Sequence, residues 1–157
     1  MKIQLWSIGK QHDASMKTAI DDFTKRINHY FPAEWKIIPV PKNSTTLSEE
    51  ELKHKEGELI LSFLKKDYYL VELDEKGQMI TSEGLAAFIN SRSGQGLKNL
   101  IFLIGGAYGL HTAVISTAKY KWSLSALTFP HHLVRLIIAE QLYRACTILK
   151  NEKYHHK

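Results

Sequence analysis

The sequence has little that would point to the cell exterior, a membrane or redox chemistry. None of its apolar runs approaches the ~18 residues that would cross a bilayer. Its single cysteine, Cys146, cannot form an internal disulfide, and its apolar neighbours predict a packed thiol. The N-terminus MKIQLWSIGK lacks both a long apolar segment and a small-residue cleavage site, so we interpret it as a first strand. These absences predict a cytoplasmic protein.

Several common catalytic and binding motifs are also missing. The sequence has no GxSxG nucleophile elbow and no GxxxxGK[ST] phosphate loop. The two pairs of adjacent histidines, at 131–132 and 155–156, do not have the spacing of zinc or iron ligands, so we expect no metal. We see no linker, repeat or low-complexity segment. The chain is therefore expected to form one domain over residues 1–157, a length that can bury a sizeable core.

The charge balance is basic but modest. A net charge of +5 and a pI near 9.2 favour anionic partners such as nucleic acid. Proteins that bind no nucleic acid often carry a similar charge, so the charge alone does not identify the partner.

Apolar runs alternate with helical patterns along the chain. We expect strands at 3–8, 35–40, 68–73, 100–104 and 122–125. We expect helices after Asp13, after Ser48 with Glu51 as a capping box, after Thr81 or Ser82, from about Leu110, and from Pro130 to about Leu149. Strands that alternate with helices predict an α/β fold with a mostly parallel sheet and helices on both of its faces.

The stretch LIFLIGGAYGLH, residues 100–111, ends a buried strand in three glycines. In parallel sheets, ligands bind beyond the carboxyl ends of the strands, and glycine lets backbone groups approach them closely. One interpretation is therefore a backbone cradle for a nucleotide-like molecule, and the alternative is a tight strand-to-helix turn. The spacing GGxxG differs from the dinucleotide fingerprint GxGxxG, which disfavours a dinucleotide enzyme.

The segment from Trp122 to Ala145 is the second informative stretch. Small and apolar residues at 124–129 precede a helix that starts at a proline, and this loop is a candidate for an adenine pocket. The alternative is that Thr128 only caps the helix. Arg144 lies four residues after Glu140, which by itself indicates a surface ion pair. Its apolar surroundings also allow a guanidinium that grips a phosphate or a base carbonyl.

The tail KNEKYHHK is basic and aromatic. Tyr154 is suited to stacking on a base, and His155 or His156 to proton transfer near neutral pH. A frayed terminus is the alternative. The C-terminal helix carries more apolar side chains than one face requires, which predicts a homodimer. These residues are Leu133, Leu136, Ile137, Leu142, Tyr143 and Ile148.

Four segments in order, FLIGGAYGL, LSALTFPHHLVR, EQLYRA and YHHK, together resemble one family. It is the SPOUT-class pseudouridine N3-methyltransferases of bacterial large-subunit ribosomal RNA, the YbeA-like proteins. The resemblance covers the whole chain, including MKIQLWSIGK at its start and KEGE at 55–58. One departure is Lys153, which stands where the family often has a proline before Tyr-His.

The resemblance implies an α/β fold with a deep trefoil knot near the C-terminus and S-adenosylmethionine as methyl donor. The substrate it implies is a pseudouridine in the helix 69 loop of 23S ribosomal RNA in the assembled ribosome, with neither DNA nor a membrane as partner. It also implies a homodimer in which paired knots form the active site. Carried over by position, the donor pocket comprises Leu73, Gly105, Leu124, Ser125, Ala126, Leu127, Thr128 and Phe129.

For catalysis we expect Arg144 to stabilise charge on the base carbonyls, Tyr154 to stack on the base and His155 to accept a proton. Three alternatives remain open at this point. The chain is a ribosome-associated RNA-binding protein without catalysis, a methyltransferase for another ribosomal or transfer RNA nucleotide, or an α/β enzyme for a small phosphorylated metabolite.

Overall fold

The computed structural model describes residues 1–156, so that Lys157, the last residue of the basic tail, lies outside the described part. Its strands are β1 (Lys2–Ile8), β2 (Ala33–Ile38), β3 (Tyr68–Met79), β4 (Asn99–Ile104) and β5 (Tyr120–Ser123). Its helices are α1 (Ala14–Ile27), α2 (Glu49–Phe63), α3 (Ser82–Gly94), α4 (Thr112–Ile115) and α5 (His131–Leu149), with a short 3-10 turn at Ser44–Thr46. The strands pair in the order β2-β1-β4-β3-β5, and all these pairings are parallel. The predicted α/β architecture is confirmed.

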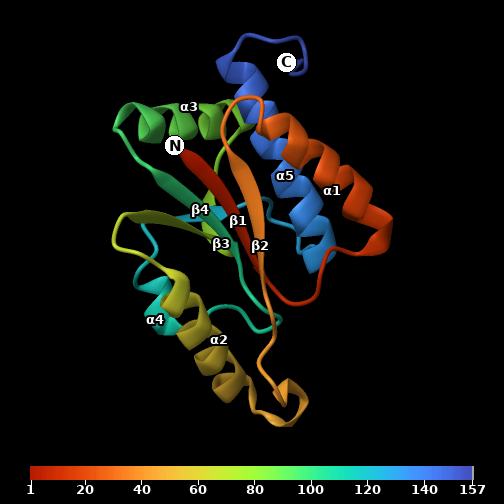
Figure 1. The fold of residues 1–157 in the computed structure, drawn as a ribbon, viewed down its shortest axis with the longest axis vertical. Coiled ribbons are helices and arrows are strands. Elements are labelled where there is room, and N and C mark those ends of the chain that lie inside the picture. The colour runs from red at the N-terminus through yellow and green to blue at the C-terminus, as the bar shows by residue number, and fades with distance from the viewer. Residues whose placement is uncertain (157) are drawn as a thin grey trace.

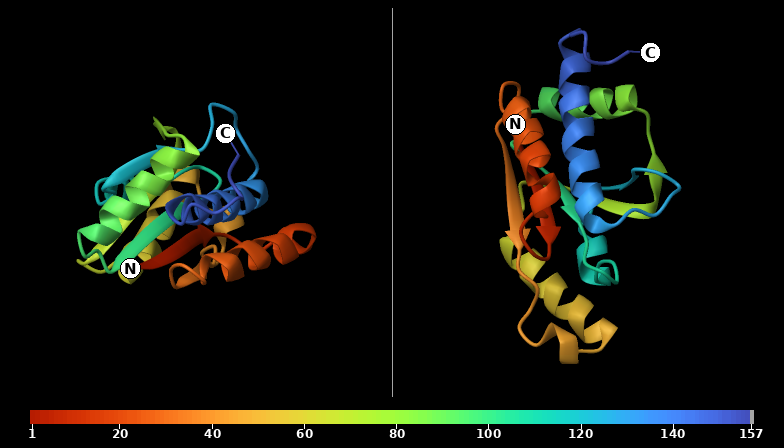
Figure 2. Two further views of the ribbon diagram at one scale, coloured as in Figure 1. Left: turned by 90° about the horizontal axis from the view of Figure 1, so that it is seen from above. Right: turned by 90° about the vertical axis from the view of Figure 1, so that its right-hand side faces the viewer.

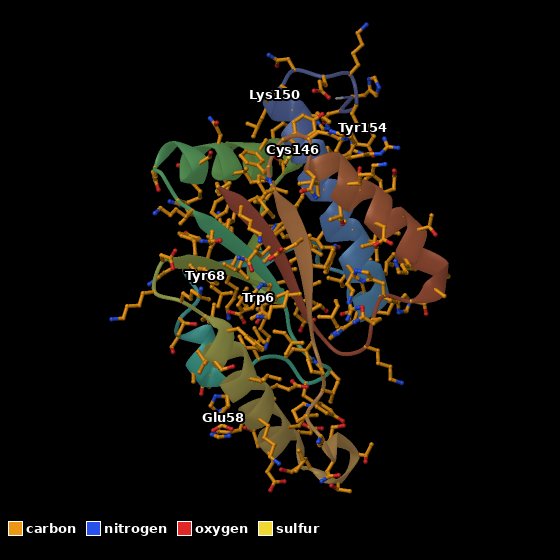
Figure 3. The ribbon with its side chains drawn as sticks, in the orientation of Figure 1. Trp6, Glu58, Tyr68, Cys146, Lys150 and Tyr154 are labelled. Carbon is orange, nitrogen blue, oxygen red and sulfur yellow. The ribbon has the colours of Figure 1, made fainter. Side chains whose placement is uncertain are left out.

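Helices cover both faces of this sheet (Figures 1 and 2). On one face, α1, α3 and α5 pack over a core that includes Phe102 and Leu142. On the other, α2 and α4 pack over a core that includes Leu103 and Trp6, the latter labelled in Figure 3. Because side chains alternate along a strand, neighbours such as Phe102 and Leu103 enter different cores. Burial on both faces explains why β4 reads as the nearly continuous apolar run NLIFLI.

Side-chain caps set most of the helix starts. Asp13 accepts a hydrogen bond from the Ser15 amide at the start of α1, and Ser48 forms the expected capping box with Glu51. At α3 the cap is Thr81 rather than Ser82, since its side chain accepts from the Gly84 amide. The short α4 begins two residues later than expected, after an N-cap at His111.

Strand β3 is longer than the sequence predicted. The pairing with β5 places Leu73 opposite Trp122, and after a bulge it places Gln78 opposite the same Trp122. The intervening residues, 74–77, are polar or glycine, so the apolar pattern that marks the strand stops at Leu73. A Cβ atom on Gly77 would lie 2.6 Å from the Trp122 carbonyl carbon, which explains the glycine at this close approach.

Cys146 lies in the core at the C-terminal end of α5, 1% exposed (Figure 3). Burial raises the pKa of its thiol to about 12, which confirms the expected packed thiol. None of the helices within residues 1–156 has the length and apolar character needed to span a bilayer.

The contact between Gly77 and β5 predicts the effect of adding one methyl group. Gly77→Ala should lower the free energy of unfolding by about 1–3 kcal/mol, because the backbone of β5 must move to accept the new atom. Gly94→Ala at the end of α3 is the matched control, since its Cβ would meet nothing within 4 Å. It should be neutral or stabilising by up to about 1 kcal/mol. Urea unfolding of both variants measures the difference, and unchanged stability for Gly77→Ala would contradict the packing argument.

Candidate functional site

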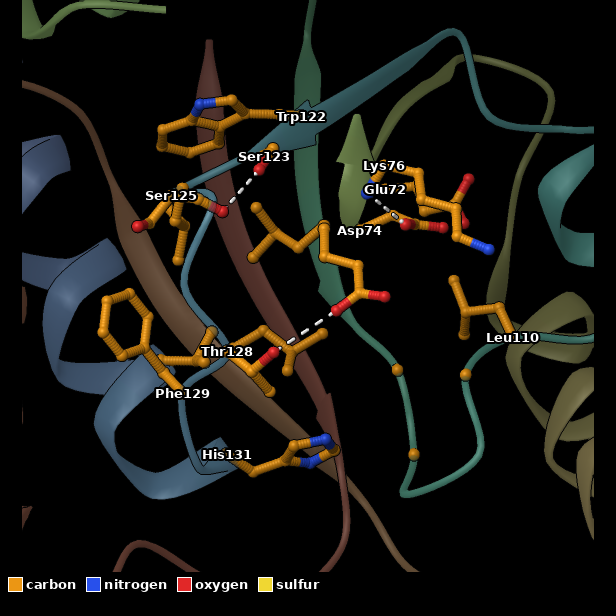
Figure 4. A pocket seen from close by; sticks show the side chains of 18 of the residues that line it. Glu72, Asp74, Lys76, Leu110, Trp122, Ser123, Ser125, Thr128, Phe129 and His131 are labelled. Atoms are coloured by element: carbon orange, nitrogen blue, oxygen red, sulfur yellow. Dashed lines mark hydrogen bonds between the residues drawn. The ribbon is translucent and has the colours of Figure 1, made fainter. Parts of the chain in front are cut away.

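A cavity of about 530 Å³ lies beyond the carboxyl ends of β3, β4 and β5 (Figure 4). Its walls come from the bulge of β3, the glycine turn after β4, the loop after β5 and the first turn of α5. They comprise residues 72–76, 104–110, 122–125 and 127–129, with His131 and Val134. This edge is where open parallel sheets bind their ligands.

The cavity brings together most of the residues predicted to form the donor pocket. Seven of those eight line it: Leu73, Gly105, Leu124, Ser125, Leu127, Thr128 and Phe129. Ala126 belongs to the same loop but is not among the lining residues. The structure thus places three segments that are distant in the sequence around one space.

Hydrogen bonds within the loop after β5 fix its shape. The Ser123 hydroxyl donates to the Ser125 carbonyl oxygen at 2.9 Å, and the Ser125 hydroxyl oxygen accepts from the Leu127 amide at 3.0 Å. The Thr128 hydroxyl donates to Glu75 Oε2 at 3.5 Å (Figure 4). Thr128 therefore joins the loop to the bulge of β3 and does not cap α5, whose N-cap is Pro130.

The glycine motif forms a tight turn at the cavity wall. The Gly109 amide donates to the Gly106 carbonyl oxygen at 3.1 Å, and Gly109 has a φ of +82°, a conformation that other residues rarely adopt. Tyr108 projects from this turn with 51% of its surface exposed. The two interpretations of this motif, a tight turn and a backbone cradle for a ligand, are therefore compatible, because the turn itself lines the cavity.

Sequence reasoning missed the acidic residues that β3 brings to the cavity, Glu72 from its regular part and Asp74 and Glu75 from its bulge. Glu72 is 2% exposed, and its Oε2 atom is buried without a hydrogen-bond partner; the Lys121 ammonium lies 3.8 Å away. Burial raises the pKa of Glu72, and Lys121 opposes this shift. Asp74 accepts from the Lys76 amide at 2.7 Å. The one indication of this acidic wall in the sequence is LDEKG at 73–77, where charged residues and a glycine follow the apolar residues of the strand.

The three predicted catalytic residues lie together at the other end of α5, where Figure 3 labels Tyr154. Arg144 Nε donates to Glu140 Oε1 at 3.0 Å, and the Tyr154 hydroxyl donates to the same oxygen at 3.1 Å. His155 Nε2 lies 3.2 Å from Glu83 Oε1, and its Nδ1 lies 3.5 Å from Arg144 Nη1. Burial and the Glu140 carboxylate raise the pKa of Tyr154. The tail up to His155 is therefore folded onto the helices, whereas His156 is exposed.

One chain does not bring this tail cluster, made of Glu140, Arg144, Tyr154 and His155, to the cavity. At 1.5 Å per residue, Arg144 lies about 20 Å along α5 from His131 at the cavity wall. Within residues 1–156, no three His, Cys, Asp or Glu side chains are placed to hold a metal ion.

The apolar face predicted for the dimer is narrower than expected. Leu142 is fully buried in the core of its own chain, and Tyr143 and Ile148 pack against that core. Leu133, Leu136 and Ile137 are partly exposed and pack against neither core cluster of the described chain. These three residues form an outward stripe on α5, which Glu140 and Arg144 continue at helical spacing.

Comparison with known proteins identifies close relatives. The family model described as a predicted SPOUT methyltransferase matches residues 1–155. Two proteins named "Ribosomal RNA large subunit methyltransferase H" are similar over their full lengths. The one from Cytophaga hutchinsonii is 50% identical over 156 residues, covering 99% of this chain and 100% of that protein. The one from Flavobacterium johnsoniae is 46% identical over 157 residues, covering 100% of both.

A solved structure supports the fold. A probable methyltransferase from Bordetella pertussis Tohama I superposes with a TM-score of 0.56 at 12% identity, covering 92% of this chain and 96% of that one. At this identity the likeness concerns the fold alone.

The contacts of the tail predict that Glu140 holds it in place. Glu140→Ala removes the acceptor shared by Arg144 and Tyr154, so trypsin should cleave after Lys150 and Lys153 several-fold faster than in the unchanged protein. Glu58→Ala, at an exposed position on α2, is the control and should leave the cleavage rate unchanged. Equal cleavage rates in all three proteins would mean that other contacts hold the tail.

Proposed function

The chain belongs to the SPOUT methyltransferase family, and from this premise we propose that it methylates N3 of a pseudouridine in the helix 69 loop of 23S ribosomal RNA, with S-adenosylmethionine as donor. The observation that carries the proposal is the convergence of seven predicted donor-pocket residues on one cavity. The names of the full-length relatives support ribosomal RNA of the large subunit as substrate. The alternative is methylation of another ribosomal or transfer RNA nucleotide.

The cavity has the properties that such a donor requires. Its volume falls in the usual range for small-molecule sites. The backbone of the glycine turn is accessible at its wall, and a buried carboxylate oxygen of Glu72 there lacks a hydrogen bond. We propose that Leu73, Gly105 and the loop 124–129 hold the donor, which supplies a methyl group on a positively charged sulfur.

The tail cluster supplies the groups that a base nitrogen needs to react. Arg144 stabilises negative charge on the base carbonyls as the N3 proton leaves. His155 accepts that proton, and Tyr154 stacks on the base. In the structure the Arg144 guanidinium lies over the Tyr154 ring, 4.7 Å from its centre, so the two groups proposed to contact the base are neighbours.

Two chains are needed to combine these groups, because the cavity and the tail cluster lie at opposite ends of α5. We propose that the outward stripe of Leu133, Leu136 and Ile137 packs against the same stripe of a second copy. A two-fold axis across antiparallel helices brings the Arg144 end of one protomer next to the His131 end of its partner. Each active site then combines the cavity of one chain with the tail of the other.

This arrangement predicts complementation between two inactive variants. Gly105→Val presses a branched side chain against Leu110, whose Cγ would lie 3.0 Å from the new Cβ, and should abolish donor binding in a folded protein. Arg144→Ala should abolish transfer while donor binding persists. After mixed refolding, roughly a quarter of the activity should return, since half of the dimers are mixed and each holds one intact site of two.

Three controls accompany the mixing experiment. Circular dichroism checks that each variant is folded, and calorimetry separates loss of donor binding from loss of transfer. Light scattering should give the mass of a dimer at micromolar concentration. A monomer mass, or a mixture as inactive as its components, would contradict the shared site.

The charge of the chain predicts that an assembled ribosome is the substrate. A surplus of +5 neutralises only a few phosphates, so free RNA is held weakly at physiological salt. Recognition of isolated RNA usually requires a dedicated module for single-stranded bases, and the sheet with its helices accounts for most of the chain. Methyl transfer should therefore be fastest on joined ribosomes, slower on isolated large subunits and slowest on protein-free RNA, at one salt concentration.

Equal rates on protein-free RNA and joined ribosomes would contradict this prediction. Mass spectrometry of ribosomal RNA from cells that lack the protein identifies the nucleotide. The expected loss is one methyl group from a pseudouridine, and loss from another nucleotide would favour the alternative.

A further inference from the structure

The wall of the cavity is acidic although the chain as a whole is basic. Three carboxylates line it, those of Glu72, Asp74 and Glu75, together with one ammonium, that of Lys76. In Figure 4, Glu72 and Asp74 lie on the side of the cavity nearer to Leu110, across from Ser125 and Phe129. A basic protein that concentrates carboxylates in one cavity provides a place for a positively charged ligand.

Two of these carboxylates share one cation. Lys121 Nζ lies 3.5 Å from Asp74 Oδ2 and 3.8 Å from Glu72 Oε2. When Glu72, Asp74 and Lys121 are all ionised, these three side chains together carry a net charge of −1. Lys121 is partly exposed, whereas Glu72 is 2% exposed. Water therefore screens the ammonium better than it screens the carboxylate.

Glu72 is the most buried carboxylate in the cavity wall, and one of its oxygens has no hydrogen bond. Glu75 accepts the Thr128 hydroxyl, and Asp74 accepts the Lys76 amide. The Oε2 atom of Glu72 is buried and accepts no hydrogen bond. A buried carboxylate oxygen without a donor is costly, and a cation in the cavity offsets that cost.

We propose that Glu72, assisted by Asp74, makes the cavity prefer the charged methyl donor over its product. This inference rests on the proposed function. S-adenosylmethionine carries a positive sulfonium, and S-adenosylhomocysteine has a neutral thioether at the same place. The two ligands differ by one methyl group and one unit of charge, so a poorly screened carboxylate attracts the donor more strongly. Once the methyl group has left, that attraction is lost and the product leaves readily.

Calorimetry with three ligands tests this selectivity without measuring catalysis. S-adenosylmethionine and sinefungin, which carries an ammonium in place of the methylated sulfur, are the charged probes, and S-adenosylhomocysteine is the neutral probe. Glu72→Gln should weaken both charged probes about tenfold and the neutral probe less than about twofold, as expected for losing one partly screened charge interaction. Glu58→Gln on the exposed face of α2 is the matched control and should change none of the three affinities.

A second variant has the opposite expected effect. Lys121→Met removes the ammonium that Glu72 and Asp74 share, and it also removes the charge that opposes the raised pKa of Glu72. Measured at alkaline pH, where Glu72 stays ionised, it should increase the preference for the charged probes over the neutral one. Because Lys121 is partly exposed, this variant decides the question even if Glu72→Gln does not fold.

The outcomes separate the two proposals. If the unchanged protein binds none of the three probes, the proposed function fails. If it binds them all and neither variant alters the ratio of charged to neutral affinities, the role of Glu72 is refuted while the proposed function stands.

Discussion

The cavity depends on one irregular strand pairing. Trp122 of β5 is opposite Leu73 of β3 and again opposite Gln78, so the chain between them must leave the plane of the sheet. The sheet tolerates this detour because Gly77 has no side chain to collide with the β5 backbone. The detour carries acidic groups to the carboxyl edge of the sheet, where a parallel sheet already leaves its loops open for a ligand. Without this detour, Asp74 and Glu75 would not reach the wall of the cavity.

The long helix α5 explains why the site is divided. Its first turn lines the cavity, and further along the helix Glu140 binds Arg144 and Tyr154 of the tail cluster. Glu83, which contacts His155, belongs to α3. A straight helix keeps its two ends apart, so the proposed active site requires a second chain in the antiparallel orientation. The outward stripe lies between the two ends and provides apolar side chains for that contact.

The order of the strands and helices could be predicted from the sequence, whereas the bulge that interrupts β3 could not. Apolar runs and capping residues such as Ser48 identify strands and helices because these signals are local. The bulge of β3 has no local signal beyond LDEKG, since it depends on pairing with a strand some fifty residues later. The family resemblance predicted which loops hold the donor. The structure adds that the hydroxyls of Ser125 and Thr128 form hydrogen bonds with other groups of the protein. The burial of Glu72 was not predictable, because a glutamate in a sequence is normally taken as exposed.

The position of β1 also has a consequence for how the chain folds. Of the five strands, β1 comes first in the chain and yet lies inside the sheet, with β2 on one side and β4 on the other, and Lys2 pairs with Asn99. Its second neighbour, β4, therefore becomes available only after about two-thirds of the 157 residues have been synthesised. Such non-local pairings slow folding, because a long loop must close before the contact forms. Until β4 has been synthesised, one edge of β1 has no partner, and its apolar side chains lack part of the core that buries them.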